Sequence, residues 1–280
     1  MLKRLLLSLL VAACAFAHVE AQRPPAPPYR ILISNDDGVR APGIAQVAMI
    51  LQAIGEVIIV APADNQSGKG HSITITEPIV RQDLTLPNGL RAIGLTATPA
   101  STVNVAIRNI VTPRPDLVVS GINRGYNLGY SAYLSGTVGA AREGVIHGVP
   151  AIAASIEEEG ALENYVYAAE EVLGVARRVK QYGLPANTYL NVNIPKRPAA
   201  GYKGYLITTQ APMQGGIESF PETKHPDGRT IYWNQYKEGV PNPPQGTDIW
   251  AVQNGYVSVT PMKVGETDAA QAERLRSIFK

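Results

Sequence analysis

A short apolar run that ends in two adjacent carboxylates constrains this chain more than any other feature. Ile31-Leu32-Ile33 leads directly into Ser34-Asn35-Asp36-Asp37-Gly38. Aliphatic residues bounded by turn-forming residues predict a buried strand followed by a turn. In open α/β sheets, ligands bind beyond the carboxyl ends of the strands, so this turn stands where a binding site would form.

Two interpretations of the turn follow from its residues. Adjacent carboxylates repel each other unless positive charge lies beside them, and hard divalent ions such as Mg²⁺ or Mn²⁺ take oxygen ligands. Asp36 and Asp37 are therefore candidate ligands of a divalent metal. The simpler interpretation is an ordinary turn in which Asp36 caps the next helix.

The next elements predict a parallel sheet. Apolar residues recur with helical spacing from Ile44 to Ile54, and Val57 to Ala61 form a second apolar run. A strand, a helix and a strand in this order predict a right-handed βαβ unit with a parallel strand pair. No G-x-G-x-x-G sequence follows the first strand, so a dinucleotide-binding function lacks its main support.

The loop after the second strand, from Pro62 to Ser72, is rich in glycines and polar side chains. Its hydroxyl and backbone N–H groups suit an anion such as phosphate. Lys69 could add charge to this loop, and His71 could add a proton donor. The simpler alternatives are a solvated loop tip for Lys69 and a capping role for His71.

A third strand is predicted from Asp116 to Ser120, and it also runs into glycines and side-chain amides. Asn123 stands where a neutral oxygen ligand would complete a carboxylate-based metal site. Further on, Ser135-Gly136-Thr137 opens a helix of small residues. Free N–H groups and the positive end of the helix dipole favour an anion there, so these residues are candidate phosphate contacts. The alternative is that Ser135 or Thr137 is a helix N-cap.

The rest of the chain predicts an α/β domain with a mostly parallel sheet and helices on both faces. We place this domain at residues 30–200, with a β-rich extension over 201–280 that is too small for an independent domain and belongs with it. Such Gly- and Pro-rich segments often contribute to oligomer interfaces. The remaining predicted elements are a hairpin around Asn88-Gly89, a helix opened by Thr98-Pro99, strands at 150–155 and 190–195, a helix at 162–183, strand-like pieces at 205–209, 230–236 and 256–260, and a helix within 267–280.

The N-terminus predicts export. Residues 1–21 have the features of a signal peptide, because basic residues precede an apolar stretch shorter than the roughly 20 residues that span a membrane. Cleavage after Ala17 or Ala21 would release a periplasmic or secreted protein. Lipidation of Cys14 in a lipobox-like sequence is the alternative. Residues 22–29 are a proline-rich spacer.

Composition excludes several other classes. The 280 residues are 45% hydrophobic and 17% charged, which predicts a packed globular core. The net charge is only +2, and no basic run indicates binding to a nucleic acid duplex. Cys14 is the only cysteine, so the mature chain has no disulfide.

Three strand-end loops with matching chemistry give the chain a family resemblance. It resembles the SurE (survival protein) phosphatases, also called 5′/3′-nucleotidases, over roughly residues 30–262. The stretches that carry the resemblance are Ile33-Ser34-Asn35-Asp36-Asp37-Gly38 with Ala41-Pro42-Gly43, Val60-Ala61-Pro62 with Asn65-Gln66-Ser67-Gly68, Val119-Ser120-Gly121-Ile122-Asn123-Arg124-Gly125 with Asn127, Ser135-Gly136-Thr137-Val138 with Glu143-Gly144, Leu190-Asn191-Val192-Asn193, and Gly246-Thr247-Asp248 with Asn254-Gly255-Tyr256-Val257-Ser258.

The resemblance implies a Rossmann-like fold and a metal-dependent phosphomonoesterase. One Mg²⁺ or Mn²⁺ ion per subunit would be held by the two aspartates, the serine of the second loop and the asparagine of the third. In this sequence these residues are Asp36, Asp37, Ser67 and Asn123. Asn127 and the Ser135-Gly136-Thr137 turn would lie against the phosphate, and Asn35 is counted among the candidate substrate contacts. The resemblance also implies a homodimer or homotetramer that assembles through the C-terminal extension.

The chemistry expected of such a site leaves two questions open. Either Asp36 or Asp37 would orient or deprotonate the attacking water, since phosphoryl transfer depends mainly on positioning and electrostatics. His71 is one candidate for protonating the leaving alcohol. The alternatives to a nucleotidase are an exported acid phosphatase of broad specificity and a non-catalytic protein that binds nucleotides or phosphate.

Overall fold

The computed structural model describes residues 27–157, 162–212, 216–237 and 241–279. The predicted signal peptide, with Cys14, lies outside the described residues. None of the helices in these ranges combines the length and the continuous apolar surface that crossing a bilayer requires.

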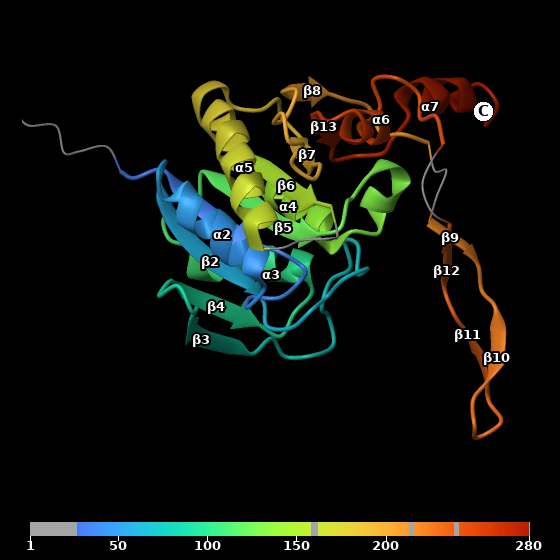
Figure 1. The fold of residues 1–280 in the computed structure, drawn as a ribbon, viewed down its shortest axis with the longest axis horizontal. Helices are drawn as coiled ribbons and strands as arrows, with labels where there is room; N and C mark the ends of the chain where they lie inside the picture. The colour runs from blue at the N-terminus through green and yellow to red at the C-terminus, as the bar shows by residue number, and fades with distance from the viewer. Residues whose placement is uncertain (1–26, 158–161, 213–215, 238–240, 280) are drawn as a thin grey trace, which may run out of the picture.

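A nine-stranded sheet forms the centre of the molecule (Figure 1). The strands are parallel from β4 to β7, and β3 and β13 run antiparallel to their neighbours β4 and β7. In spatial order they are β3 (Arg81–Thr85), β4 (Arg91–Leu95), β2 (Glu56–Pro62), β1 (Arg30–Ser34), β5 (Leu117–Arg124), β6 (Ala151–Ile156), β7 (Thr188–Ile194), β13 (Val257–Lys263) and β8 (Tyr205–Ile207). The predicted α/β architecture and the hairpin around Asn88-Gly89 are confirmed.

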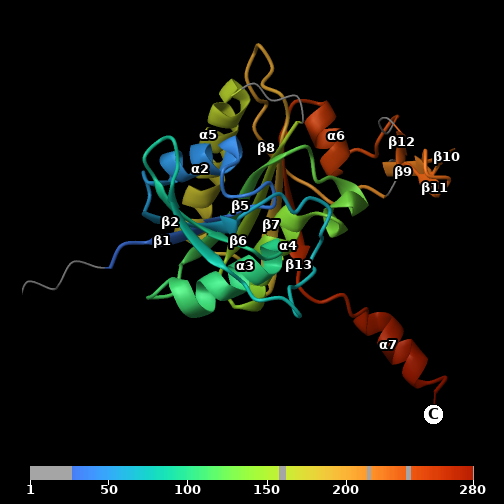
Figure 2. The same ribbon diagram turned by 90° about the horizontal axis from the view of Figure 1, so that it is seen from below.

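Helices cover both faces of the sheet, as the sequence predicts (Figure 2). Two of them, α2 (Pro42–Leu51) and α5 (Leu162–Tyr182), pack on one face. The other face carries α3 (Pro99–Val105), the π-helical turn η1 (Ala106–Ile110) and α4 (Gly136–Ile146). Between β5 and α4 lies the short 3₁₀ helix η2 (Gly129–Tyr133).

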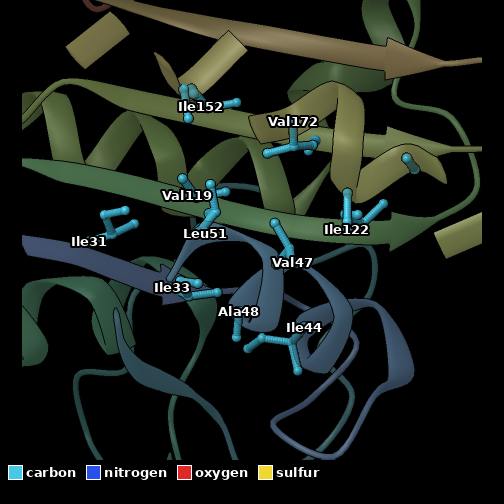
Figure 3. Close-up of a cluster of buried hydrophobic side chains, with 14 of the residues drawn as sticks. Ile31, Ile33, Ile44, Val47, Ala48, Leu51, Val119, Ile122, Ile152 and Val172 are labelled. Carbon is cyan, nitrogen blue, oxygen red and sulfur yellow. The ribbon is translucent and has the colours of Figure 1, made fainter. Parts of the chain in front are cut away.

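The first strand is buried on both faces, which explains its uninterrupted apolar sequence. Successive side chains of a strand point to opposite faces of the sheet. Ile31 and Ile33 therefore pack in the cluster beneath α2 and α5, whereas Leu32 packs in the cluster beneath α3 and α4 (Figure 3). Full burial of each such side chain stabilises the fold by about 1.5–3 kcal/mol. The turn that follows β1 is thus attached to one of the best-packed strands.

The C-terminal extension divides into parts that join the domain and parts that leave it. Both β8 and β13 continue the main sheet, and α6 (Asp248–Gln253) lies beside them. The strands β9 (Gly216–Ser219), β10 (Glu222–Lys224), β11 (Thr230–Tyr232) and β12 (Gln235–Lys237) form a long arm that projects from the body (Figure 1). The last helix, α7 (Ala269–Arg276), also extends away from the body, with no buried residue (Figure 2).

Candidate functional site

The turn after β1 is closed by its own asparagine. The Asn35 side chain is fully buried, and its Nδ2 group donates a hydrogen bond of 2.8 Å to the carbonyl oxygen of Gly38. Gly38 has a φ of +100°, a conformation that favours glycine. Asn35 therefore shapes the turn, and contact with a substrate stays a prediction for this residue.

Asp36 faces the start of α4 and not the start of α2. Its side chain is only 3% exposed, and the hydroxyl of Thr137 donates a hydrogen bond to its Oδ1 atom. Gly136 lies so close that a Cβ atom there would be 2.9 Å from Asp36 Oδ2. Burial raises the pKa of Asp36, and hydrogen bonds from Thr137 and the neighbouring backbone lower it in part. The N-cap of α2 is Ala41, without a side-chain hydrogen bond, so the interpretation of Asp36 as the cap of the next helix is wrong.

Asp37 connects the first loop to the loop after β5. Its Oδ2 atom accepts a hydrogen bond of 3.1 Å from the backbone N–H of Arg124. Burial, together with the adjacent negative charge of Asp36, raises the pKa of Asp37 to about 6. Two carboxylates held together in this way are costly when both are ionised, which is the electrostatic condition that a bound cation relieves.

Asn123 presents the atom that a metal site needs. A register shift between β5 and β6 lies at Ser120 to Asn123, where Gly121 has a φ of +132°. Asn123 is buried, and its Nδ2 group donates a hydrogen bond of 2.7 Å to the carbonyl oxygen of Gly125. Because the amide nitrogen is engaged in this way, the Oδ1 atom is the end of the side chain that remains to accept a cation.

The loop after β2 is attached at several points along its length. Gln66 donates its backbone N–H to the carbonyl oxygen of Asp36 at 2.7 Å, and Gly70 donates to that of Leu134 at 2.9 Å. Ser67 lies exposed between these two attachments, and its own N–H bonds to Asn65 Oδ1 at 2.9 Å. Ser67 is therefore held beside the turn that carries Asp36 although it lies at a loop tip.

A buried cluster of polar side chains anchors the same loop to α4. Glu143, 5% exposed, accepts hydrogen bonds from His71 Nε2 at 2.8 Å and Asn104 Nδ2 at 2.7 Å. His147 Nε2 lies 3.1 Å from Glu143 Oε1, the oxygen that also accepts the hydrogen bond from Asn104. Burial would raise the pKa of Glu143, but its hydrogen bonds with His71 and Asn104 hold that pKa below its usual value. His71 is therefore neither a cap nor an isolated proton donor, whereas Lys69 is exposed, as expected of a loop tip.

The candidate phosphate contacts differ in how far their polar groups are already engaged. Asn127 is buried and its Nδ2 group donates to Ser155 Oγ at 2.7 Å, while its carbonyl oxygen accepts from Asn191 Nδ2 at 2.7 Å. Ser135 is the N-cap of α4, because its Oγ atom accepts the N–H of Val138 at 3.2 Å. The capping alternative for Ser135 is confirmed, and its contact with phosphate stays a prediction, as it does for Asn127, Gly136 and Thr137.

The donor set fits a hard divalent cation. Within the described ranges, no group of three His, Cys, Asp or Glu side chains could hold a metal ion. The predicted set instead combines two carboxylates, the hydroxyl of Ser67 and the amide oxygen of Asn123. Oxygen-only ligands of this kind suit Mg²⁺ or Mn²⁺ and do not suit a soft metal. These four residues are the ones that would hold the ion.

Two groups of supporting residues have roles that the sequence did not predict, although Glu143, Asn191 and Asn193 lie in stretches that carry the family resemblance. In the Glu143 cluster, His71 and Asn104 lie 72 and 39 positions before Glu143, and no local pattern reveals these two contacts. Glu143, the single acidic residue of α4, was the available signal. Asn191 and Asn193, which both donate to the Asn127 carbonyl, alternate along a buried strand, and that alternation was a second signal.

Comparison with known proteins gives the family of the chain. A family model described as "Survival protein SurE" matches residues 31–215. The chain belongs to the SurE family. It is 40% identical over 247 residues to a protein of Geobacter sulfurreducens named "5'-nucleotidase SurE", an alignment that covers 88% of this chain and 92% of that protein. It is also 40% identical over 256 residues to "5'-nucleotidase SurE 1" of Thermus thermophilus, covering 90% and 98% of the two chains.

A solved structure extends the likeness from sequence to fold. The crystal structure of the SurE protein from Aquifex aeolicus matches with a TM-score of 0.77 and 37% sequence identity, covering 90% of this chain and all of that one. This agreement includes the mostly parallel sheet on which the three loops lie.

Proposed function

We propose that this chain is a divalent-metal-dependent phosphatase that hydrolyses nucleoside monophosphates, at the 5′ or the 3′ position, to a nucleoside and inorganic phosphate. The observation that carries the proposal is the Asp36–Asp37 pair. Its carboxylates lie where the loops after β1, β2 and β5 meet the N-terminus of α4. The names of the bacterial relatives support a 5′-nucleotidase.

The two aspartates have different surroundings, which suggests different roles. When bound, a divalent ion would polarise a phosphoryl oxygen and favour deprotonation of the attacking water. Asp36 is buried and bonded to Thr137, so we assign it to anchoring the site. Asp37 is partly exposed and bonded to a single backbone N–H, so we assign it to orienting the water. The water oxygen adds to phosphorus, the ester P–O bond breaks, and the alcohol leaves with a proton.

The groups around the phosphate follow from the same arrangement. Asn127 Nδ2 carries a second hydrogen besides the one that it donates to Ser155, and Ser135 Oγ can donate while it accepts from Val138. Both groups can therefore bond to phosphoryl oxygens without breaking their structural contacts. Because His71 Nε2 is engaged with Glu143, we assign His71 to holding the loop and not to the leaving alcohol.

A substrate panel tests this proposal. Phosphate release is measured from 5′- and 3′-nucleotides and from p-nitrophenyl phosphate, after chelation and after addition of Mn²⁺ or Mg²⁺. Asp37→Asn is compared with Asp83→Asn, which removes a carboxylate that is exposed on β3 and paired with Arg81. We expect metal-dependent release that Asp37→Asn abolishes and Asp83→Asn preserves. Equal rates on all esters would instead indicate a broad phosphatase, and no release would indicate a binding protein.

We also propose that the protein is exported. The proposal rests on the signal-peptide features of residues 1–21. The N-terminus of the protein purified from its native source is expected to begin near residue 18 or 22. A protein that retains Met1, or one that becomes lipidated unless Cys14 is replaced by Ser, would contradict this form of export.

The projecting arm supports a proposal of self-association. Phe220, Tyr232 and Trp233 of the arm are exposed by 57–62%. Large apolar side chains on a projecting segment are typical of a subunit interface. Light scattering is expected to give the mass of a homodimer or homotetramer, and a monomeric mass at micromolar concentration would contradict the proposal.

A further inference from the structure

The carboxyl group of Asp248 has no part in the proposed reaction, yet it joins three segments of the chain. Asp248 is the first residue of α6 and is fully buried. Its Oδ2 atom accepts the N–H of Gly129 at 2.7 Å, and its Oδ1 atom accepts those of Ala211 and Ile249 at 2.9 and 2.8 Å. Burying a carboxyl group is costly unless hydrogen bonds compensate for the lost water. The three N–H groups supply this compensation, so Asp248 and the backbone around it hold each other in place.

Gly129 is the contact of Asp248 that leads to the candidate site. It begins η2, lies two residues after Asn127, and belongs to the segment that runs on to Ser135. Figures 1 and 2 both show this segment, in green, beside the red helix α6. The segment therefore begins and ends at predicted phosphate contacts, and Asp248 holds it between them.

A second side chain of the C-terminal extension holds the same glycine. Gln210 Nε2 donates to the carbonyl oxygen of Gly129 at 2.9 Å. Gly129 has a φ of +51°, and a Cβ atom there would lie 2.8 Å from the carbonyl oxygen of Ala211. The absence of a side chain thus allows the two backbones to approach closely. Both the N–H and the carbonyl group of Gly129 are bonded to side chains of the extension.

The backbone of Asn127 is held from the other side by β7. Asn193 Oδ1 accepts its N–H at 2.9 Å, and Asn191 Nδ2 donates to its carbonyl oxygen at 2.7 Å. Residues 127–129 are therefore fixed at both ends by buried polar side chains. A shift of Gly129 would change the direction in which the Asn127 side chain leaves this backbone.

The two aspartates of the site have attachments of their own. Asp36 is bonded to the hydroxyl of Thr137, and Asp37 accepts the backbone N–H of Arg124. Neither attachment involves residues 127–129 or the C-terminal extension. Loss of the Asp248 contact should therefore disturb the predicted phosphate contacts more than the predicted metal ligands.

We propose that Asp248 is a positioning residue for phosphate binding, because through Gly129 it holds Asn127 in the orientation that lets its side chain bond to a phosphoryl oxygen. The inference rests on the proposed function, which assigns Asn127 to the phosphate. Asp248 acts through the backbone and does not itself contact the substrate. The C-terminal extension then contributes to the site as well as to the predicted subunit interface.

Asp248→Asn tests this role with a side chain of the same shape. One oxygen becomes an NH₂ group, which is a donor and cannot accept an N–H. If the remaining oxygen faces Ala211 and Ile249, the NH₂ group faces the N–H of Gly129, and the two donors move apart. We expect kcat/KM for 5′-AMP to fall about tenfold, mainly through a higher KM, because Asn127 would bind the phosphate in the substrate and in the transition state alike.

Two affinities distinguish positioning from a general loss of structure. Titration calorimetry of the Mn²⁺-loaded protein gives Kd for inorganic phosphate, and electron paramagnetic resonance gives Kd for Mn²⁺. In Asp248→Asn we expect Kd for phosphate to rise about tenfold and Kd for Mn²⁺ to change less than about twofold. The matched control is Asp116→Asn, whose carboxyl group also accepts a backbone N–H, that of Arg30 at 2.7 Å, beside the first residue of β1. It is expected to change neither affinity.

Gln210→Leu provides an independent perturbation of the same glycine. Gln210 is partly exposed, so this variant is expected to fold even if Asp248→Asn does not. It removes the donor to the Gly129 carbonyl group and is expected to lower kcat/KM about three- to fivefold. Since both side chains act on Gly129, the double variant is expected to lose less than the product of the two single losses.

The outcomes separate this inference from the proposed function. Folded variants with a lower Tm but unchanged kcat/KM and unchanged phosphate affinity would overturn the proposal, since Asp248 would then be structural only. A loss of Mn²⁺ affinity as large as the loss of phosphate affinity would also overturn it. If the wild type releases no phosphate from any ester, the proposed function fails; a phosphate affinity that still depends on Asp248 would then leave the positioning role standing, and a wild type that binds no phosphate would refute it.

Discussion

Replacing Gly139 with Ala tests whether α4 positions the loop that carries Ser67. A Cβ atom at residue 139 would lie 2.3 Å from the carbonyl oxygen of Gly70 and 3.2 Å from the Cα atom of His71. Ordinary contacts of this kind begin at 3.4 Å, so the loop or the helix must move by about 1 Å. Both obstacles are backbone atoms, which cannot turn aside as a side chain would.

The expected cost divides between stability and activity. Overpacking destabilises by about 1–3 kcal/mol, whereas replacing a helical glycine with alanine gains about 1 kcal/mol in helix propensity. The net loss of stability is therefore expected to be at most about 2 kcal/mol. A displacement of about 1 Å in a positioning element can cost about 100-fold in rate, so kcat/KM for 5′-AMP is expected to fall by about 10–100-fold.

The assay compares Gly139→Ala with Gly174→Ala, a helical glycine of α5. A Cβ atom at residue 174 would approach the hydroxyl end of the Tyr205 side chain, which can move. Phosphate release and thermal unfolding are measured for both variants across a range of Mn²⁺ concentrations. We expect Gly139→Ala alone to lose activity and to need more Mn²⁺. A folded Gly139→Ala enzyme with wild-type kcat/KM would refute the argument that this contact positions Ser67.

Three further predictions concern the carboxylates. Since folding raises the pKa of Asp37 to about 6, the metal-free protein loses stability from this group as pH rises from about 4 to 6. A metal that binds below this pKa must displace the proton of Asp37, so Mn²⁺ is expected to raise Tm more at pH 7.5 than at pH 5. Equal increments of Tm at the two pH values would count against the metal site. Because folding lowers the pKa of Glu143, its stabilising effect is present at neutral pH and lost as pH falls through the lowered pKa. Glu143→Gln is expected to destabilise by about 1–3 kcal/mol at pH 7 in denaturant titrations, with a difference that shrinks in acid; a pH-independent difference would contradict the role of its charge. Thr137→Val removes the hydroxyl bonded to Asp36 and is expected to lower kcat/KM by about tenfold or more, whereas an unchanged value would show that this bond does not position the carboxylate.

Local sequence patterns predicted the sheet because its strands are buried on both faces. An apolar run such as Ile31 to Ile33 has few alternatives to a central strand, and the turn formers after it place Asp36 and Asp37 at the sheet edge. The same reasoning placed Asn123 at the end of β5. The parallel order of β1, β2 and β5 then brings these residues together without further information.

The contacts that hold the site in place could not be predicted in this way. His71 and Glu143 are 72 positions apart, and their pairing depends on how α4 lies across the sheet. Thr137 was predicted to contact a phosphate, because it lies at a helix N-terminus. In the structure its hydroxyl donates instead to the carboxyl group of Asp36. The joining of β13 to β7 likewise depends on a long-range pairing, so the extension looked more separate in the sequence than it is.

The most direct test of a metal site on Asp36 and Asp37 is to measure Mn²⁺ binding and phosphate release on the same samples. Electron paramagnetic resonance counts the bound Mn²⁺ of the wild type, Asp36→Asn and Asp37→Asn, and release from 5′-AMP is followed in parallel. The wild type is expected to bind one Mn²⁺ per chain and to show metal-dependent hydrolysis. Folded samples of either variant are expected to lose both. Near wild-type binding and turnover by either variant would contradict a metal site built on these two carboxylates.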